Sequence, residues 1–168
     1  MELPSMRTRA ALALAEENET ARRDLYALLN RFPASTIATG NVETEDNVRG
    51  ILCHVTFSIY SYSCWMRRVR GLLDPAVEKN DKASFLDRVR SLTRGEEFDE
   101  ASRWASAHYY ETLADVKKDE LEQEHKSNWG ETLSIELMME HALVHLLRHR
   151  RQLQIFLGDR PQRPTRSE

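Results

Sequence analysis

Long segments in which apolar residues recur every three or four positions alternate along the chain with shorter, mostly polar segments. The clearest apolar stripe consists of Ile51, Val55, Ile59, Tyr62, Met66, Val69 and Leu73. Because an α-helix turns once every ~3.6 residues, this spacing places the stripe on one face, as a core-facing helix requires. No stretch shows sustained strict alternation of apolar and polar residues, and only 6 Gly and 5 Pro occur. The pattern therefore favours long helices over a sheet.

Four long helices are predicted from such stripes, at about residues 8–31, 45–73, 98–116 and 131–157. Pro33 stops the first and Pro75 closes the second, because proline cannot continue a helix interior. The charged segment between residues 78 and 97 indicates a short helix through Phe85, Leu86, Val89 and Leu92. Amphipathic helices of this length commonly bury their stripes against one another in a four-helix bundle. We therefore predict an all-α four-helix bundle with a short extra helix between the second and third long helices.

The length of 168 residues fits one domain. We place this domain at residues 1–158 and predict a loosely ordered, Pro- and Arg-rich tail at residues 159–168. Charged residues make up 30 % of the chain and the net charge is −3, with acids and bases interspersed. This balance is typical of a soluble globular protein. The arginines near the C-terminus are interpreted as a solvated helix end, so no nucleic-acid partner is predicted.

The sequence also predicts a cytoplasmic location without a membrane partner. No apolar run approaches the ~20 residues that a bilayer-spanning helix needs. The N-terminus lacks the basic and apolar regions of a signal peptide. Cys53 and Cys64 lie too far apart along one helix to form a disulfide, so we interpret them as buried or free thiols of a reducing compartment.

The predicted fourth helix carries His141, His145 and His149 at intervals of four residues. At ~100° per residue, successive members are rotated by only about 40°, so all three line one side of the helix. Imidazoles one turn apart can bind the same metal ion, whereas solvated helix faces normally carry Lys, Glu and Arg. We interpret the three histidines as contributing two ligands to a divalent-metal site, with an ordinary solvated helix face as the alternative.

Two familiar kinds of metal site do not fit this pattern. A zinc peptidase helix needs a Glu directly after its first histidine, and here Ala142 follows His141. A ferritin-like di-iron bundle needs two Glu-x-x-His motifs, and only one occurs, ending at His125 in a polar connection. A mononuclear site needs a third ligand from elsewhere. His54, on the flank of the second helix's stripe, is the best candidate, and His108 is interpreted as a core residue.

Two segments together resemble the DinB-like (YfiT-like) metal-binding bundles. The first is the end of the fourth helix, His141-x-x-x-His145-x-x-x-His149-Arg150-x-Gln152, introduced by residues 129–133. The second is residues 48–55, which resemble the family's helix with the first histidine ligand. Two departures stand out. Arg151 replaces the usual Gly, and Ser58 and Ser61 stand where many members have a Glu.

The resemblance implies a bundle with up-down-down-up connectivity, often a homodimer, and a three-histidine site that binds nickel, zinc or a similar divalent ion. Carried over by position, the ligands are His54, His145 and His149. His141 matches a common family histidine that is not usually a ligand. The sequence leaves open whether His141 or His108 joins the metal shell. The candidate pocket residues are His141, Arg148, Gln152, Tyr62 and Trp65, and no catalytic residue is assigned.

The same resemblance suggests the reaction. Better-understood relatives are transferases and isomerases that use bacillithiol or mycothiol, so we predict a metal-dependent thiol S-transferase that joins a low-molecular-weight thiol to small electrophiles. One alternative is a metal-dependent hydrolase of a small substrate, which would need a nearby general base, and no residue is an obvious candidate for that base. The other alternative is a non-catalytic, stress-related metal-binding bundle. A structural site of that last kind would normally be closed by a fourth protein ligand.

Overall fold

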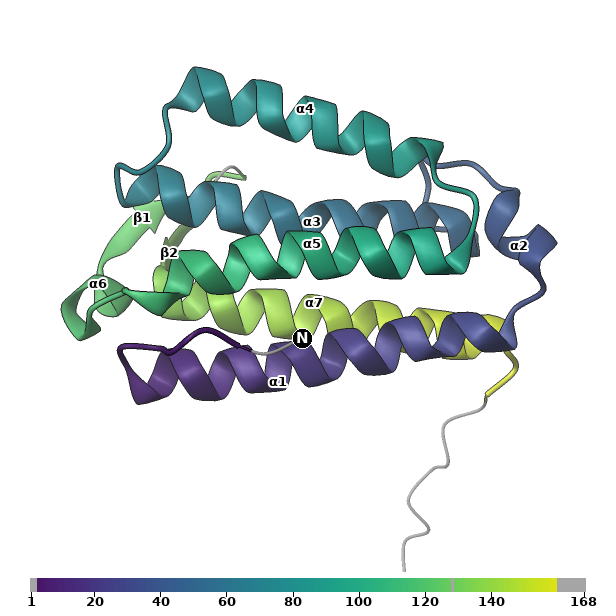
Figure 1. The fold of residues 1–168 in the computed structure, drawn as a ribbon, viewed down its shortest axis with the longest axis horizontal. Helices are drawn as coiled ribbons and strands as arrows, with labels where there is room; N and C mark the ends of the chain where they lie inside the picture. Colours follow the sequence, from purple (N-terminus) through teal and green to yellow (C-terminus); the bar gives the residue numbers. More distant parts are fainter. Residues whose placement is uncertain (1–2, 128, 160–168) are drawn as a thin grey trace, which may run out of the picture.

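The computed structural model describes residues 3–127 and 129–159, and helices make up most of them (Figure 1). The four long helices are α1 (Arg9–Ala27), α3 (Val48–Val69), α5 (Gly95–Ala114) and α7 (Ile135–Phe156). The remaining elements are η1 (Leu28–Arg31), α2 (Ala34–Ala38), α4 (Pro75–Ser91), α6 (Lys118–Glu122), β1 (Glu124–Lys126) and β2 (Thr132–Ser134). None of the helices within these described ranges is long and apolar enough to cross a membrane.

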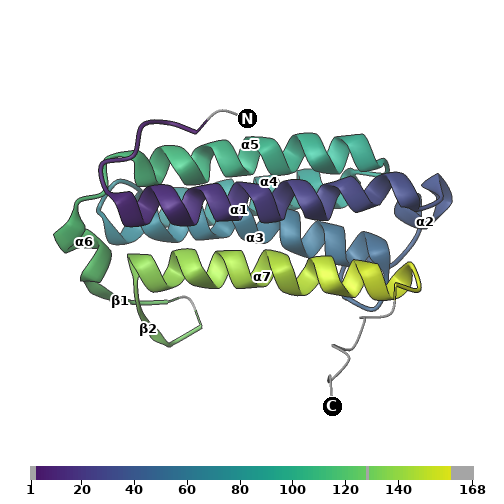
Figure 2. The same cartoon turned by 90° about the horizontal axis from the view of Figure 1, so that it is seen from below.

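The four long helices form a bundle in which α1 contacts α7 and α5, and α3 contacts the same two helices from the other side. In Figure 1, α1 and α7 run in one direction, whereas α3 and α5 run in the opposite direction. Figure 2 shows α5 and α7 at opposite edges of the bundle, with the hairpin β1–β2 beside the N-terminal end of α7. The all-α bundle with up-down-down-up order is therefore confirmed.

The connection between α3 and α5 explains this order. α4 packs against α3 on the outside of the bundle (Figure 1). It returns the chain to the end of the bundle at which α3 begins, so that α5 runs parallel to α3. This extra helix was predicted, but at 17 residues it is longer than the apolar positions indicated. Asp74 caps it by accepting from the Ala76 amide, and Pro75 occupies its first turn, where proline is favoured. Pro75 thus starts α4, while α3 already ends at Val69.

The ends of the predicted helices are corrected at the two places that matter for the site. α3 begins at Val48 rather than near residue 45, because Asn47 accepts from the Gly50 amide as its N-cap. α7 begins at Ile135, where Ser134 caps it. The residues before it form β2, which pairs antiparallel with β1. This small hairpin was not predicted. The predicted tail lies outside the described residues except for Asp159.

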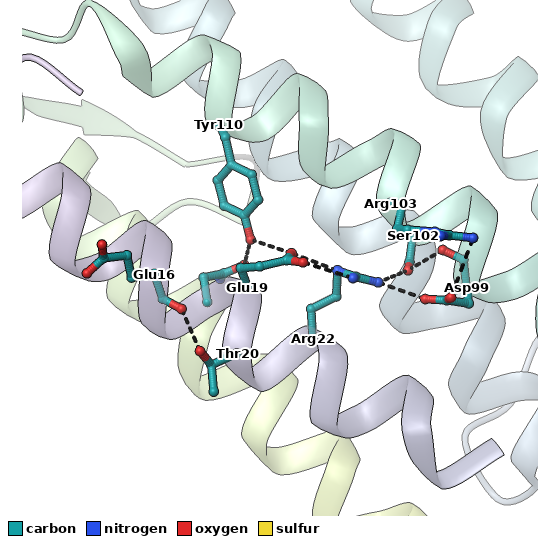
Figure 3. Close-up of polar contacts among 9 residues, drawn as sticks. Glu16, Glu19, Thr20, Arg22, Asp99, Ser102, Arg103 and Tyr110 are labelled. Carbon is teal, nitrogen blue, oxygen red and sulfur yellow. Dashed lines mark hydrogen bonds and ion pairs between the residues drawn. The ribbon is translucent and has the colours of Figure 1, made fainter. Parts of the chain in front are cut away.

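A buried ion network joins α1 to α5 (Figure 3). The guanidinium of Arg22, only 3 % exposed, donates to both oxygens of Glu19. It also donates to Asp99 Oδ1 at 2.8 Å and Ser102 Oγ at 3.0 Å. The Tyr110 hydroxyl donates to Asn18 and lies 3.4 Å from the Glu19 carboxylate. Since cations, anions and hydroxyls are all present, this network satisfies its own charges and ties two antiparallel helices together.

Candidate metal centre

Three histidine side chains meet on the seam between α3 and α7. His54 lies in the second turn of α3, His145 lies at the middle of α7, and His149 follows one turn later. Because these two helices are antiparallel, the start of α3 lies beside the end of α7 (Figure 1). His149 is buried at 1 % exposure, whereas the His54 side chain is 39 % exposed. The cluster therefore has one buried wall and one side open to solvent.

The three rings present the same atom to a common point. His145 Nε2 lies 2.9 Å from His54 Nε2 and 3.1 Å from His149 Nε2. The ligand atoms of the three residues all lie within 4.8 Å of one another. Nitrogens held ~2.0–2.1 Å from one metal ion are separated by about 2.9 Å at a right angle and about 3.3 Å at a tetrahedral angle. The observed separations fall in this range, so the three residues fit a divalent ion.

The protonation state also suits a metal site. Burial, together with the charges of the neighbouring His149, His54, His141 and Arg148, lowers the pKa of His145 to about 2. Burial likewise lowers the pKa of His149 and of His54, although the Glu45 carboxylate acts in the opposite direction on both. The three imidazoles are therefore neutral at pH 7, which is the form that binds metal ions.

The outward-facing nitrogens of two of these rings lie close to acceptors. His149 Nδ1 donates to Gln152 Oε1 at 2.5 Å. His54 Nδ1 lies 3.4 Å from Glu45 Oε1, and His149 Nδ1 lies 4.0 Å from Glu45 Oε2. Such partners fix the tautomer in which Nε2 is free to bind a metal. Gln152 was a predicted pocket residue, whereas sequence reasoning missed Glu45, because its loop position nine residues before His54 gives no periodic signal.

The remaining predicted pocket residues, Tyr62, Arg148 and Trp65, have different surroundings. The Tyr62 ring packs edge-on against His145 and His141, with centroid separations of 5.8 and 5.7 Å. Arg148 is exposed, and its positive charge contributes to the lowered pKa values of the three clustered histidines. Trp65 is buried and donates to the Lys126 carbonyl, so it anchors β1.

Neither of the two histidines left open by the sequence belongs to the three-histidine group. His141 is exposed and lies between the rings of Trp129 and Tyr62. His108 packs against Trp104 with a centroid separation of 4.3 Å. Its side chain is 36 % exposed, so it is a partly buried surface residue rather than the core residue predicted.

The donor set determines what the centre can do chemically. Within the described ranges, no carboxylate or thiol joins the three histidines in the group. Three protein nitrogens leave at least one coordination position of a tetrahedral or octahedral ion for water or substrate. The partly exposed His54 marks the side from which such a ligand could enter. The arrangement therefore supplies three protein ligands and lacks, among the described residues, the fourth that would close the site.

Comparison with known proteins agrees with this geometry. The family model described as the DinB family matches residues 6–159, which include all four long helices and all three clustered histidines. The resemblance predicted from the two histidine segments is thus confirmed. No curated protein matches the chain.

Proposed function

The chain belongs to the DinB family, and we propose that it binds one divalent metal ion and acts as a metal-dependent thiol S-transferase on small electrophiles. The observation that carries the proposal is the convergence of three neutral imidazoles on one point, without a fourth protein ligand among the described residues. A closed structural site would use a fourth ligand. The two free, buried cysteines also support the predicted cytoplasmic location.

The proposed metal is nickel or zinc, because imidazole donors suit both ions. When bound, a divalent ion would supply a Lewis acid that stabilises a thiolate at neutral pH. His54, His145 and His149 would hold that ion, and the charge of Arg148 would favour an anionic sulfur nearby. In the overall reaction the thiol loses its proton to solvent, a sulfur–carbon bond forms, and the leaving group departs with the electron pair of its bond to carbon.

Metal analysis of the purified protein tests the centre. We expect about one divalent ion per chain in the wild type and a large loss in His54→Ala and His145→Ala. His108→Ala is the matched control, because it removes a partly exposed imidazole outside the group. Unchanged metal content in both ligand variants would refute the site.

A conjugation assay tests the reaction. A model electrophile is incubated with metal-loaded protein and each of several low-molecular-weight thiols, and the thioether is quantified. We expect product that requires both the thiol and the three histidines. Consumption of the substrate without thiol would instead indicate hydrolysis, and full metal occupancy with no turnover of any substrate would indicate a non-catalytic bundle.

The proposed assembly is a homodimer through the outer face of α7. Leu137, Val144 and Ile155 are 45, 61 and 60 % exposed. At ~100° per residue they lie within about 20° of one another on the helix, and large apolar side chains left exposed on one helix face support an interaction surface there. Val144→Glu should convert a dimer into a monomer in light scattering, whereas a monomeric wild type would contradict the assembly.

A further inference from the structure

Glu45 lies against two of the three metal-binding histidines, although it comes from neither of their helices. It belongs to the loop between α2 and α3, two residues before the cap of α3 at Asn47. One carboxylate oxygen is 3.4 Å from His54 Nδ1 and the other is 4.0 Å from His149 Nδ1. A single side chain thus faces the outward nitrogens of one ligand from α3 and one from α7.

The loop that carries Glu45 is fixed by specific contacts. Asn47 accepts from the Gly50 amide and donates to the Asn41 carbonyl at 2.9 Å. A Cβ on Gly50 would lie 1.7 Å from the Thr44 carbonyl oxygen and 2.7 Å from that of Asn41. Only glycine therefore lets residues 41–44 lie directly against the first turn of α3. This close approach holds the loop against the start of α3, where the Glu45 carboxylate lies 3.4 Å from His54 Nδ1.

A neutral imidazole carries one proton, so only one of its two nitrogens can bind a metal ion. A ligand that coordinates through Nε2 must carry its proton on Nδ1, and an acceptor beside Nδ1 selects that tautomer. His149 has Gln152 at 2.5 Å for this purpose. Among the described residues, the acceptor beside His54 Nδ1 is Glu45.

We propose that Glu45 is a positioning residue, which accepts from His54 Nδ1 and thereby keeps the His54 lone pair directed at the metal position. The inference rests on the metal-binding part of the proposed function and not on the transfer reaction. Glu45 faces the Nδ1 edges of the rings, away from the point where the three Nε2 atoms meet. Its role is therefore that of a hydrogen-bond acceptor and not of a fourth ligand.

Three variants test this role. Glu45→Ala removes the acceptor, Glu45→Gln keeps an acceptor oxygen but makes a poor metal ligand, and Glu43→Ala is the matched control. Glu43 lies in the same loop, but its carboxylate pairs with Arg90 at 2.7 Å. The first measurement is the tautomer of His54 in metal-free protein, by long-range ¹H–¹⁵N NMR with the signal assigned by its loss in His54→Ala. The second is zinc affinity by competition with a chelator.

We expect the wild type and Glu45→Gln to show the Nδ1–H tautomer of His54 and similar zinc affinity. Glu45→Ala should show increased Nε2–H tautomer and about tenfold weaker zinc binding, at the low end for such partners because the carboxylate is 38 % exposed. An unchanged tautomer in Glu45→Ala would overturn the proposal. So would a loss of affinity in Glu45→Gln as large as in Glu45→Ala, which would make Glu45 a direct ligand, or an equal loss in Glu43→Ala. Because the tautomer is read without metal or thiol, this result is independent of any failure to find zinc binding or transferase activity.

Discussion

Two polar clusters occupy opposite seams of the same bundle, and they differ in whether they satisfy themselves. The seam between α1 and α5 holds Arg22 against the carboxylates of Glu19 and Asp99 and the Ser102 hydroxyl, and Tyr110 contacts Glu19 (Figure 3). The seam between α3 and α7 holds three imidazoles whose Nε2 atoms point at one another. In the cluster between α1 and α5, donors are paired with acceptors by hydrogen bonds. The second brings together lone pairs, which only a cation can satisfy jointly.

The pKa values of the two clusters show the same contrast. Burial alone lowers the pKa of Arg22, but the carboxylates of Glu19 and Asp99 outweigh it and raise that pKa. Burial also lowers the pKa of His145, and there the neighbouring imidazoles and Arg148 lower it further. Desolvation thus acts in the same direction on both clusters, but the first stays charged and paired, whereas the second is neutral and its lone pairs are open to a ligand. A buried polar cluster indicates a ligand site when its members share one kind of unsatisfied atom.

The largest expected effect comes from breaking the closed network. Arg22→Met keeps an apolar stem and removes the guanidinium from beside the buried Glu19 carboxylate and from Asp99. Loss of one partner from a buried ionic group typically costs about 3–5 kcal/mol, and we expect a decrease of that size in the free energy of unfolding, measured with urea. Zinc binding by the folded fraction should not change.

Arg103→Met is the matched control for that substitution. Arg103 also faces Asp99, at 3.6 Å, but its side chain is 53 % exposed. Exposed pairs contribute at most about 1 kcal/mol, so the control should lose little stability. Equal losses in the two variants would contradict the distinction between a buried network and a surface pair.

The second prediction concerns the open cluster, which should gain stability only from its metal. At a free zinc concentration 100 times the dissociation constant, binding to the folded state alone adds about 2.7 kcal/mol to the free energy of unfolding. We expect this gain in the wild type and its absence in His145→Ala, measured by urea denaturation with and without zinc. A comparable zinc-dependent gain in His145→Ala would mean that the ion binds elsewhere.

The third prediction uses pH on the metal-free protein. The pKa of His145 is lowered from 6.5 to about 2, so below pH 6.5 the unfolded chain binds a proton there that the folded chain does not. Stability therefore falls as the pH decreases from 6.5, by up to about 1.4 kcal/mol per pH unit for each such histidine, and is flat with respect to this group above that range. Between pH 6.5 and 5, His145→Ala should show a shallower slope of unfolding free energy against pH. Parallel slopes would show that His145 takes up its proton equally in both states.

The helical architecture could be predicted from the sequence, because apolar stripes such as that from Ile51 to Leu73 repeat with the period of an α-helix whose one face packs on the core. The length of α4 could not, since its first half carries few apolar residues and its start depends on the cap at Asp74. The hairpin β1–β2 was missed because each strand has only three residues, too few for a period-two pattern.

The candidate site divides in the same way. His145 and His149 follow from helical spacing, and His54 could be proposed from its seam position and from the family resemblance. Glu45 could not be found, because its approach to His54 depends on a loop that packs on Gly50. The Arg22 network was also missed, because its residues come from two helices that only the tertiary fold brings together. Local periodicity identifies ligands on helices, whereas contacts that depend on loops and seams require the structure.

The smallest expected effect is at His141, and it defines the edge of the open cluster. His141 continues the four-residue spacing of His145 and His149, so the sequence alone does not separate it from them. In the structure its exposed ring lies between Trp129 and Tyr62, with its centroid 6.3 Å from that of His145. His141→Ala should therefore keep full zinc content and bind zinc within about twofold of the wild type, corresponding to about 0.4 kcal/mol. A loss as large as that of His145→Ala would make His141 a ligand, and the site would then be closed by four histidines rather than open.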